Sequence, residues 1–110
     1  MVDRSVVLAK AVLNTAKKLG LCEDQLAKVL GVDYSTIQQL TTLDPSSEPG
    51  ERALILIQIF RSLYAYSGGN AEWIQRFMKS QNRMIGGIPI EQVQNEAGLI
   101  KVLEYFRYFE

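Results

Sequence analysis

Side chains that can read DNA bases follow one another over residues 34–42, YSTIQQLTT. Glutamine can pair in bidentate fashion with adenine, and serine and threonine hydroxyls reach bases or phosphates. The segment carries no arginine or lysine, so the common bidentate contact to guanine is missing. The residues that we expect to contact DNA are Lys28, Tyr34, Ser35, Thr36, Gln38 and Gln39, with Thr42, Lys17 and Lys18 as further contacts.

Catalytic and metal-binding sets of side chains are missing from the sequence. The chain has no histidine, which excludes Ser-His-Asp and Cys-His catalysis. Its one cysteine, Cys22, excludes the usual zinc ligand sets, and there is no phosphate-binding loop. We therefore expect no catalytic residue, no metal, no cofactor and no small-molecule substrate, and a protein that acts by contact rather than as an enzyme.

Cysteine usage and the first residues bear on the compartment. A single cysteine allows no intrachain disulfide, which fits a reducing cytoplasm. Asp3 and Lys10 interrupt the apolar run at the start, so this run is neither a signal peptide nor a membrane span. We expect a cytoplasmic protein that does not contact the membrane.

The charge of the chain is balanced, with 12 Lys and Arg residues against 12 Asp and Glu residues. Nucleic-acid binders usually carry a basic surplus, because phosphate contacts supply most of their affinity. The balance therefore indicates that one chain alone binds DNA weakly, and that two copies of the reading segment are needed.

Three helices are predicted around the reading segment, over residues 5–19, 23–30 and 34–42. The second and third fit a helix-turn-helix, which needs a small residue where the helices cross and a turn residue that tolerates a left-handed backbone. Ala27 and Gly31 meet these needs, and Asp33 is placed to cap the third helix. The apolar residues expected in their shared core are Leu26, Leu30, Val32, Ile37 and Leu40. The run LAKVLGVDYSTIQQL is similar to the phage-repressor class of helix-turn-helix.

A polar break divides the chain at residues 44–51, DPSSEPGE, which hold two of the three prolines. We predict a helix-turn-helix domain over residues 1–43, a linker over 44–51 and a second domain over 52–110. Helices are expected in the second domain over 52–67, 71–79 and 98–109, with a short helix beginning at Pro89. No strand pattern extends for long, so the predicted fold class is all-α.

The helix over residues 52–67 is apolar on most of its circumference. One stripe consists of Ala53, Leu56, Ile57, Phe60, Leu63 and Tyr64, and the remaining face of Leu54, Gln58, Arg61 and Ala65. A second stripe, Ile55, Ile59 and Tyr66, also needs a cover, because a helix this apolar is buried on most sides. A second copy of the chain is the simplest cover, which predicts a homodimer. The alternative is that other helices of the same chain cover both stripes.

Residues 52–105 resemble the toxin-binding domain of antitoxins of the Xre/MbcA/ParS type. The resemblance lies in the order of its parts: the apolar helix ERALILIQIFRSL, then Trp73, the segment QNRMIGGIPIEQV with Asn82, Gly86 and Pro89, a further Gly98, and the helix KVLEY with Val102 and Leu103. Together with the Xre-like helix-turn-helix before it, the resemblance covers nearly the whole chain. Trp73 itself is expected in the core, because an indole on an amphipathic helix is usually buried.

The resemblance implies a two-gene system. In this family the antitoxin forms a dimer, represses its own promoter and blocks a partner toxin, which is typically a RES-domain enzyme that consumes NAD. Antitoxin segments near the C-terminus cover the entrance to the toxin's active site. The residues of this chain that we expect to contact a toxin are Asn82, Arg83, Tyr105, Arg107, Tyr108 and Glu110.

Alternatives stay open for these residues and for the function. Asn82 and Arg83 can serve loop hydrogen bonding and solvation instead, and Phe106 and Phe109 can close the core while the other C-terminal residues fray. Family members often continue past the last helix with a Gly-containing tail, and the competing expectation is that in this chain the ending EYFRYFE takes the blocking role. Besides an antitoxin, the sequence fits a stand-alone helix-turn-helix repressor whose tail serves only dimerisation. It also fits an interaction adaptor that binds no DNA, which the zero net charge favours.

Overall fold

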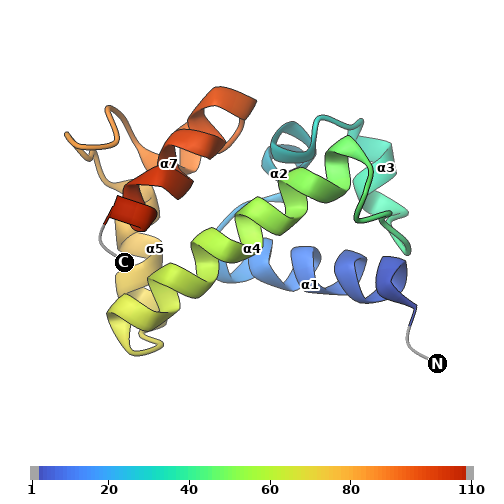
Figure 1. The fold of residues 1–110 in the computed structure, drawn as a ribbon, viewed down its shortest axis with the longest axis horizontal. Coiled ribbons are helices and arrows are strands. Elements are labelled where there is room, and N and C mark those ends of the chain that lie inside the picture. Colours follow the sequence, from blue (N-terminus) through green and yellow to red (C-terminus); the bar gives the residue numbers. More distant parts are fainter. Residues whose placement is uncertain (1–2, 109–110) are drawn as a thin grey trace.

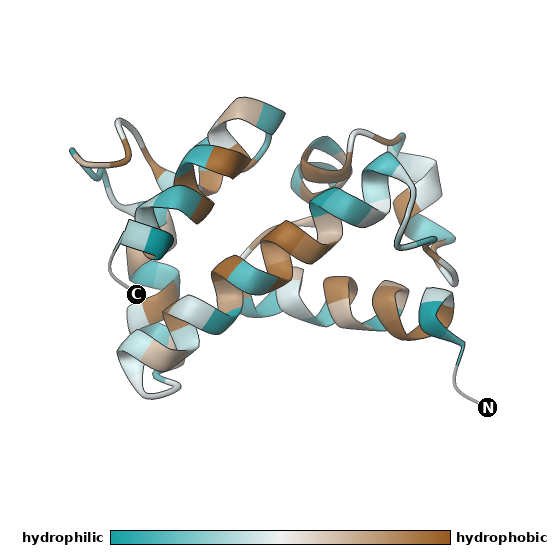
Figure 2. Cartoon of the chain, in the orientation of Figure 1, coloured by the Kyte–Doolittle hydropathy of each residue, from teal (hydrophilic) through white to brown (hydrophobic). Residues whose placement is uncertain are grey.

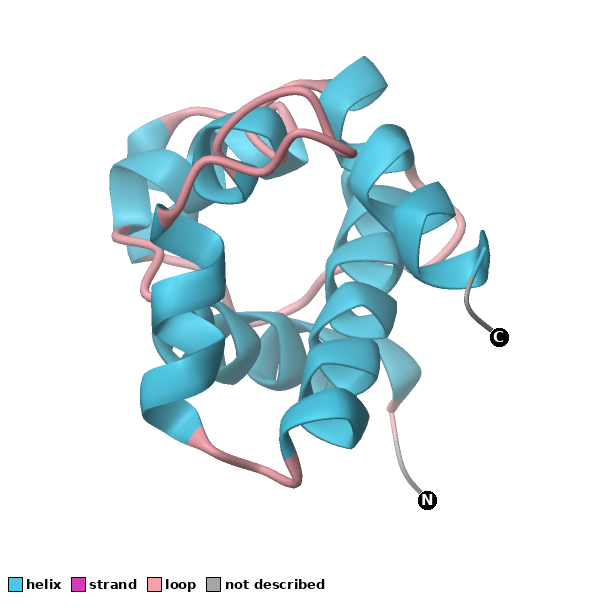
Figure 3. Cartoon of the chain, turned by 90° about the vertical axis from the view of Figure 1, so that its left-hand side faces the viewer, coloured by secondary structure: helices cyan, strands magenta, loops and turns pink. Residues whose placement is uncertain are grey.

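Helix α4, Glu48–Ser67, crosses the middle of the computed structural model, and the other helices lie on either side of it (Figure 1). The structure describes residues 3–108. Within that range the chain forms seven helices and no strand, which confirms the all-α fold class (Figure 3). The helices before α4 are α1 (Arg4–Leu19), α2 (Glu23–Leu30) and α3 (Tyr34–Gln38), and those after it are α5 (Ala71–Lys79), α6 (Pro89–Gln92) and α7 (Glu96–Tyr108).

Helix α4 supplies the core at both ends of the molecule. It packs against α1 and α2 from the first half of the chain and against α5 and α7 from the second half. Its residues Ala53, Leu56, Ile59 and Leu63 are fully buried. Figure 2 shows the strongly hydrophobic stretch of α4 where the helix crosses the molecule. One core cluster therefore contains residues from both halves of the chain.

Arg52 on α4 links the helix-turn-helix to the last helix. Its Nη2 atom lies 3.2 Å from Oε2 of Glu96, at the start of α7. Its guanidinium also lies so close to Gly31 that a Cβ atom there would clash with it. Gly31 ends α2 with a φ of 72°, a left-handed conformation that favours glycine. The turn thus favours glycine for its backbone conformation, and a larger residue would also displace the Arg52 guanidinium.

Helix α4 begins at Glu48, four residues before the predicted start at residue 52, so residues 48–51 of the expected linker form its first turn. Pro49 is the reason for the difference, because a proline in the first turn of a helix lacks only an N–H group that would have no partner there. Ser47 caps the helix by accepting a hydrogen bond from the Gly50 N–H, 3.1 Å away. The assignment of two domains on either side of residues 44–51 stays a prediction.

The turn before α4 is held by Asp44. Its Oδ1 atom accepts hydrogen bonds from the backbone N–H and the hydroxyl of Ser46, at 2.9 and 2.8 Å. These bonds, the backbone one first, hold the pKa of Asp44 below its ordinary value. Because the folded pKa is lowered, the carboxylate stabilises the turn above the unfolded pKa, and this contribution is lost as the pH falls through the folded pKa.

Helix α3 is shorter than predicted, since it ends at Gln38 rather than at Thr42. The chain leaves the helix because residues 39–43 turn back toward α1. There the N–H of Leu43 donates a hydrogen bond to the Ser5 carbonyl, at 2.9 Å, and the Leu43 side chain is buried. Thr42 therefore does not lie on the reading helix.

The other helices follow the predicted bounds closely. Helices α2 and α5 match them, α6 begins at Pro89 as expected, and α1 begins one residue early. Helix α7 begins at Glu96, two residues before the predicted start at 98, because Oδ1 of Asn95 accepts a hydrogen bond from the Gly98 N–H at 2.8 Å.

The chain itself covers only part of the second stripe of α4, at Ile59. Ile59 is 0 % exposed and Ile55 is half-buried, whereas Tyr66 stays 55 % exposed. The cover is α7, whose Phe106 ring lies 5.9 Å from the ring of Tyr66. Ile59 was therefore wrongly predicted as a dimer contact, because α7 returns to a face that the helix pattern alone leaves open. The remaining face of the helix, Leu54, Gln58, Arg61 and Ala65, is exposed.

Replacing Ile59 by alanine should lower the free energy of unfolding by about 2–5 kcal/mol, because it leaves a cavity between α4 and α7. Chemical denaturation at two protein concentrations measures this. The loss should not depend on concentration, and Leu54→Ala on the exposed face should have little effect. A loss that appears only at high concentration would return Ile59 to a dimer interface.

Candidate functional site

The helix-turn-helix has the packing that the sequence predicts. Ala27 is buried where α2 meets α3, and Ile37 is the buried residue of α3. Asp33 is the N-cap residue of α3 through its backbone carbonyl, which accepts a hydrogen bond from the Thr36 N–H at 3.0 Å. The residues predicted to contact DNA all lie exposed: Lys28, Tyr34, Ser35, Thr36, Gln38 and Gln39. Gln39 lies just after α3, as its C-cap.

Basic side chains flank this exposed surface unequally. Lys17 and Gln38 line the same groove of about 260 Å³ between α1, α2 and α3. The ammonium of Lys28 lies 3.7 Å from Asp24 one turn earlier, an exposed pair that is weak and easily exchanged for a phosphate. Lys18 lies over the ring of Phe60 on α4, 5.7 Å from its centre, and so is directed toward α4. Lys17 is therefore better placed than Lys18 to support a contact by α3.

Five aromatic rings gather where α4, α5 and α7 meet. We call this the aromatic cluster: Tyr66, Trp73, Phe77, Tyr105 and Phe106. Phe77 lies at its centre, stacked on Trp73 at 5.7 Å and 5.6 Å from Phe106. The edge of Tyr105 meets Phe106 at 5.1 Å. These rings, together with Asn82, line a cavity of about 320 Å³. Spacings of this kind are favourable for aromatic pairs, so the cluster is well packed around an open cavity.

Trp73 lies at the surface of the aromatic cluster rather than in the core, where the sequence placed it. It is 40 % exposed, whereas Ile74 and Met78 on the same helix are buried. Helix α5 buries the aliphatic side of its apolar face and leaves the indole at the edge, stacked on Phe77. The sequence pattern could not separate these two sides, and it therefore missed the aromatic cavity.

The loop over residues 82–87 is organised by Asn82. Its Oδ1 atom accepts hydrogen bonds from the backbone N–H groups of Met84 and Ile85, at 2.9 and 3.1 Å. Its own N–H donates to the Gly87 carbonyl at 2.9 Å, and its carbonyl accepts from the Gly86 N–H at 2.8 Å. Asn82 thus has a structural role, and its contact with a partner stays a prediction.

The tip of this loop and the end of α7 expose further side chains near the aromatic cluster. Arg83 and Met84 are exposed at the tip. Phe106 is buried, as the core alternative expected, and Tyr105 is half-buried in the aromatic cluster. Arg107 is exposed, and Tyr108 is 80 % exposed. The predicted contact at Glu110 and the core role of Phe109 lie outside the described residues.

Residues 3–108 contain neither a candidate membrane span nor a candidate metal site. No helix there is both long and apolar enough to cross a membrane. Over the same residues, no group of three or more His, Cys, Asp or Glu side chains is arranged to hold a metal ion.

Two family models match the chain. The antitoxin Xre-like helix-turn-helix domain matches residues 2–58, and the antitoxin Xre/MbcA/ParS C-terminal toxin-binding domain matches residues 61–107. No curated protein matches the chain. The exposed surface of α3 falls within the first match, and the whole aromatic cluster falls within the second.

Replacing Asn82 by alanine should lower the free energy of unfolding by about 1–3 kcal/mol, because the N–H groups of Met84 and Ile85 lose their acceptor. Asn82→Asp keeps an acceptor oxygen and should retain most of the stability. Thermal unfolding of both variants, with the exposed Gln81→Ala as control, measures the difference. Equal stability of the alanine and aspartate variants would contradict the loop role.

Proposed function

The chain belongs to the family of antitoxins with an Xre-like helix-turn-helix and an Xre/MbcA/ParS toxin-binding domain, and on this basis we propose that it neutralises a RES-domain toxin that consumes NAD. It does so by covering the entrance to the toxin's active site, and as a dimer it represses its own promoter. The action is occlusion, so the proposal assigns no catalytic residue to this chain.

The observation that carries toxin binding is the open aromatic cluster within the toxin-binding domain. Single exposed apolar side chains are ordinary on protein surfaces. Here, however, Tyr66 and Trp73 are both exposed and both line one cavity. Rigid tryptophan and tyrosine rings next to a cavity are typical of the few residues that supply most of the binding energy at an interface. A toxin side chain that enters the cavity would displace water from five rings at once.

Polar residues around the aromatic cluster complete the proposed toxin surface. Arg83 lies on the neighbouring loop, and Arg107 and Tyr108 lie at the end of α7. A polar rim around an apolar centre is the usual arrangement of an interface. We propose toxin contacts at Asn82, Arg83, Tyr105, Arg107, Tyr108 and Glu110, with Trp73 and Met84 added from the structure.

Promoter binding is proposed for the exposed side of α3. The helix has five residues and no basic side chain, so one helix-turn-helix, which we call the head, offers few contacts to DNA. Two heads related by a two-fold axis would read two half-sites, which is how helix-turn-helix proteins reach useful affinity. This need, rather than the covered stripe of α4, supports a homodimer. Ile55 and Tyr66 retain exposed surface and stay candidate contacts.

A second candidate function is favoured by the same short, uncharged helix. An antitoxin whose head packs against α4 without binding DNA would need no basic surplus, and the chain has none. The two candidates differ in one measurable property: binding through phosphates weakens steeply as salt rises, because counterions are released.

The first experiment is to tag the protein in its native host, capture it at native expression and identify the bound proteins by mass spectrometry. A stoichiometric partner that consumes NAD when purified alone, and stops when this chain is added, would support the proposal. If only copies of this chain are captured from cells that are shown to express a neighbouring toxin gene, the stand-alone repressor becomes the better hypothesis.

Replacing Trp73 by alanine should weaken toxin binding by about 30-fold or more, the loss typical of a residue at the centre of an interface. Isothermal titration with the captured toxin gives the affinity. Leu54→Ala is the matched control, because Leu54 is equally exposed, at 40 %, but lies outside the aromatic cluster. Equal affinity of the two variants would move the toxin surface away from the aromatic cluster.

The double variant Gln38→Ala, Gln39→Ala should weaken binding of a promoter fragment by about tenfold or more, because a bidentate glutamine–adenine pair contributes about 1–3 kcal/mol. Fluorescence anisotropy at three salt concentrations measures this, with Gln81→Ala as control. An unchanged affinity would discard these two residues as readers. If the wild-type protein shows no salt-dependent binding of the promoter fragment, the result would favour the second candidate function, in which the helix-turn-helix binds no DNA.

A further inference from the structure

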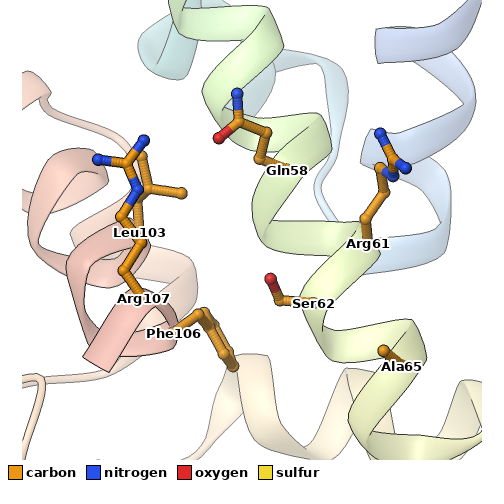
Figure 4. Close-up of a pocket in the computed structure, with 7 residues that line it drawn as sticks. All are labelled: Gln58, Arg61, Ser62, Ala65, Leu103, Phe106 and Arg107. Atoms are coloured by element: carbon orange, nitrogen blue, oxygen red, sulfur yellow. The ribbon is translucent and has the colours of Figure 1, made fainter. Parts of the chain in front are cut away.

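A second surface, separate from the aromatic cavity, lies between α4 and α7. It is a groove of about 340 Å³, shown in Figure 4. Gln58, Arg61 and Ser62 line it from α4, and Leu103 and Arg107 line it from α7. We call it the arginine groove. Among these residues only Arg107 was predicted from the sequence to contact a toxin.

The arginine groove has a buried apolar floor and two exposed arginines among the residues that line it. Leu103 and Phe106 are buried, so the floor is fixed by the core. Arg107 is exposed on α7 and Arg61 is exposed on α4, and none of the residues that line the groove is acidic. Residues 3–108 form two ion pairs, Lys28 with Asp24 and Arg52 with Glu96, and neither of them includes Arg61 or Arg107. The groove thus carries two positive charges without a counter-charge from the lining residues.

The positions of the two guanidinium groups indicate the shape of a ligand. Figure 4 shows Arg107 on the α7 wall and Arg61 on the far side of α4, with the amide of Gln58 between them. The guanidinium groups do not point toward one another. A single phosphate would need hydrogen-bond donors that converge on one point. Two separated guanidinium groups, each with a planar fork of N–H donors, instead suit two carboxylates on one peptide segment. The amide of Gln58 and the hydroxyl of Ser62 add neutral hydrogen-bonding groups between them.

Charge also decides against a second copy of this chain as the occupant. Two copies placed face to face would bring Arg61 and Arg107 of each toward the same arginines of the other. With no acidic residue in the lining, like charges would meet, and this arrangement costs binding energy. A partner with acidic side chains relieves the same charges.

We propose that the arginine groove binds an acidic segment of the toxin, with Arg61 and Arg107 each holding one carboxylate. This rests on the proposed antitoxin function and adds to it a second contact area. Arg61 and Arg107 both lie within the match to the toxin-binding domain, residues 61–107. Phe106 lines both the floor of the groove and the aromatic cavity, so a toxin that covers the end of α7 reaches both.

The test measures the dissociation constant of the captured toxin for four full-length variants: R61Q, R107Q, the double variant, and R76Q as control. Arg76 is an exposed arginine on α5 that does not line the groove, so R76Q makes the same change in charge elsewhere. Each groove substitution should weaken binding about tenfold and the double about 100-fold, with a shallower salt dependence, while R76Q stays near wild type. Melting temperatures should not change, because both side chains are exposed.

A charge exchange identifies the toxin residues. Toxin variants in which one acidic residue at a time is changed to lysine should restore the affinity that R61E or R107E loses. Restoration by one pair and by no other fixes the contact. Toxin that binds the double variant as tightly as wild type would overturn the arginine groove but leave the antitoxin function standing.

Two further outcomes are informative. A wild-type chain that captures no toxin would overturn the antitoxin proposal and the groove together. Inorganic phosphate, titrated into the free chain and followed by NMR of the arginine side chains, tests the other source of negative charge. Phosphate that saturates both guanidinium groups without reducing toxin binding would make the groove an anion site and overturn the proposal.

Discussion

Burial of α4 against helices from both halves of the chain is the constraint on which the rest of the structure depends. Fully burying a large aliphatic side chain contributes about 1.5–3 kcal/mol, and this helix buries Leu56, Ile59 and Leu63 completely. Their neighbours come from α1 and α2 on one side of the sequence and from α5 and α7 on the other. Neither set alone covers the helix, so the position of each half is fixed by its contact with α4.

The polar and aromatic side chains of the candidate sites lie on the surface, outside this core. At one end α3 exposes neutral hydroxyl and amide groups, which can contact base edges or phosphates. At the other end, five rings and two unneutralised arginines frame the end of α7. A net charge of zero hides this distribution, because the acidic residues lie elsewhere and do not line either surface of the second half.

Local rules allowed much of the fold to be predicted. The helix-turn-helix follows from Ala27 and Gly31, since a small residue at a crossing and a left-handed turn are requirements of short range. The caps at Asp3 and Asn70 act within one turn of their helices, and the start of α1 and the bounds of α5 were close to prediction. Predictions failed where the structure of a residue depends on a contact with residues that are distant in the sequence. Leu43 ends α3 by packing on α1, and Ile59 is covered by α7, some 40 residues later in sequence.

The candidate sites were predicted less completely for the same reason. Exposure of the α3 side chains follows from the position of Ile37 within one helix. The aromatic cavity needs rings from three helices, and the arginine groove needs residues from two, so each exists only in the folded chain. Periodicity placed Trp73 on the apolar face of α5, but it contained no information about which part of that face α4 and α7 would cover.

The two family matches meet between residues 58 and 61, in the interior of α4 and far from either end of it. The boundary between the two matches therefore does not coincide with a gap in the core, because both matched segments contribute to one helix and one core cluster. A chain of this size with a single core unfolds as a whole. Cleavage in either half therefore unfolds the α3 surface and the aromatic cluster together, so the two surfaces share one lifetime.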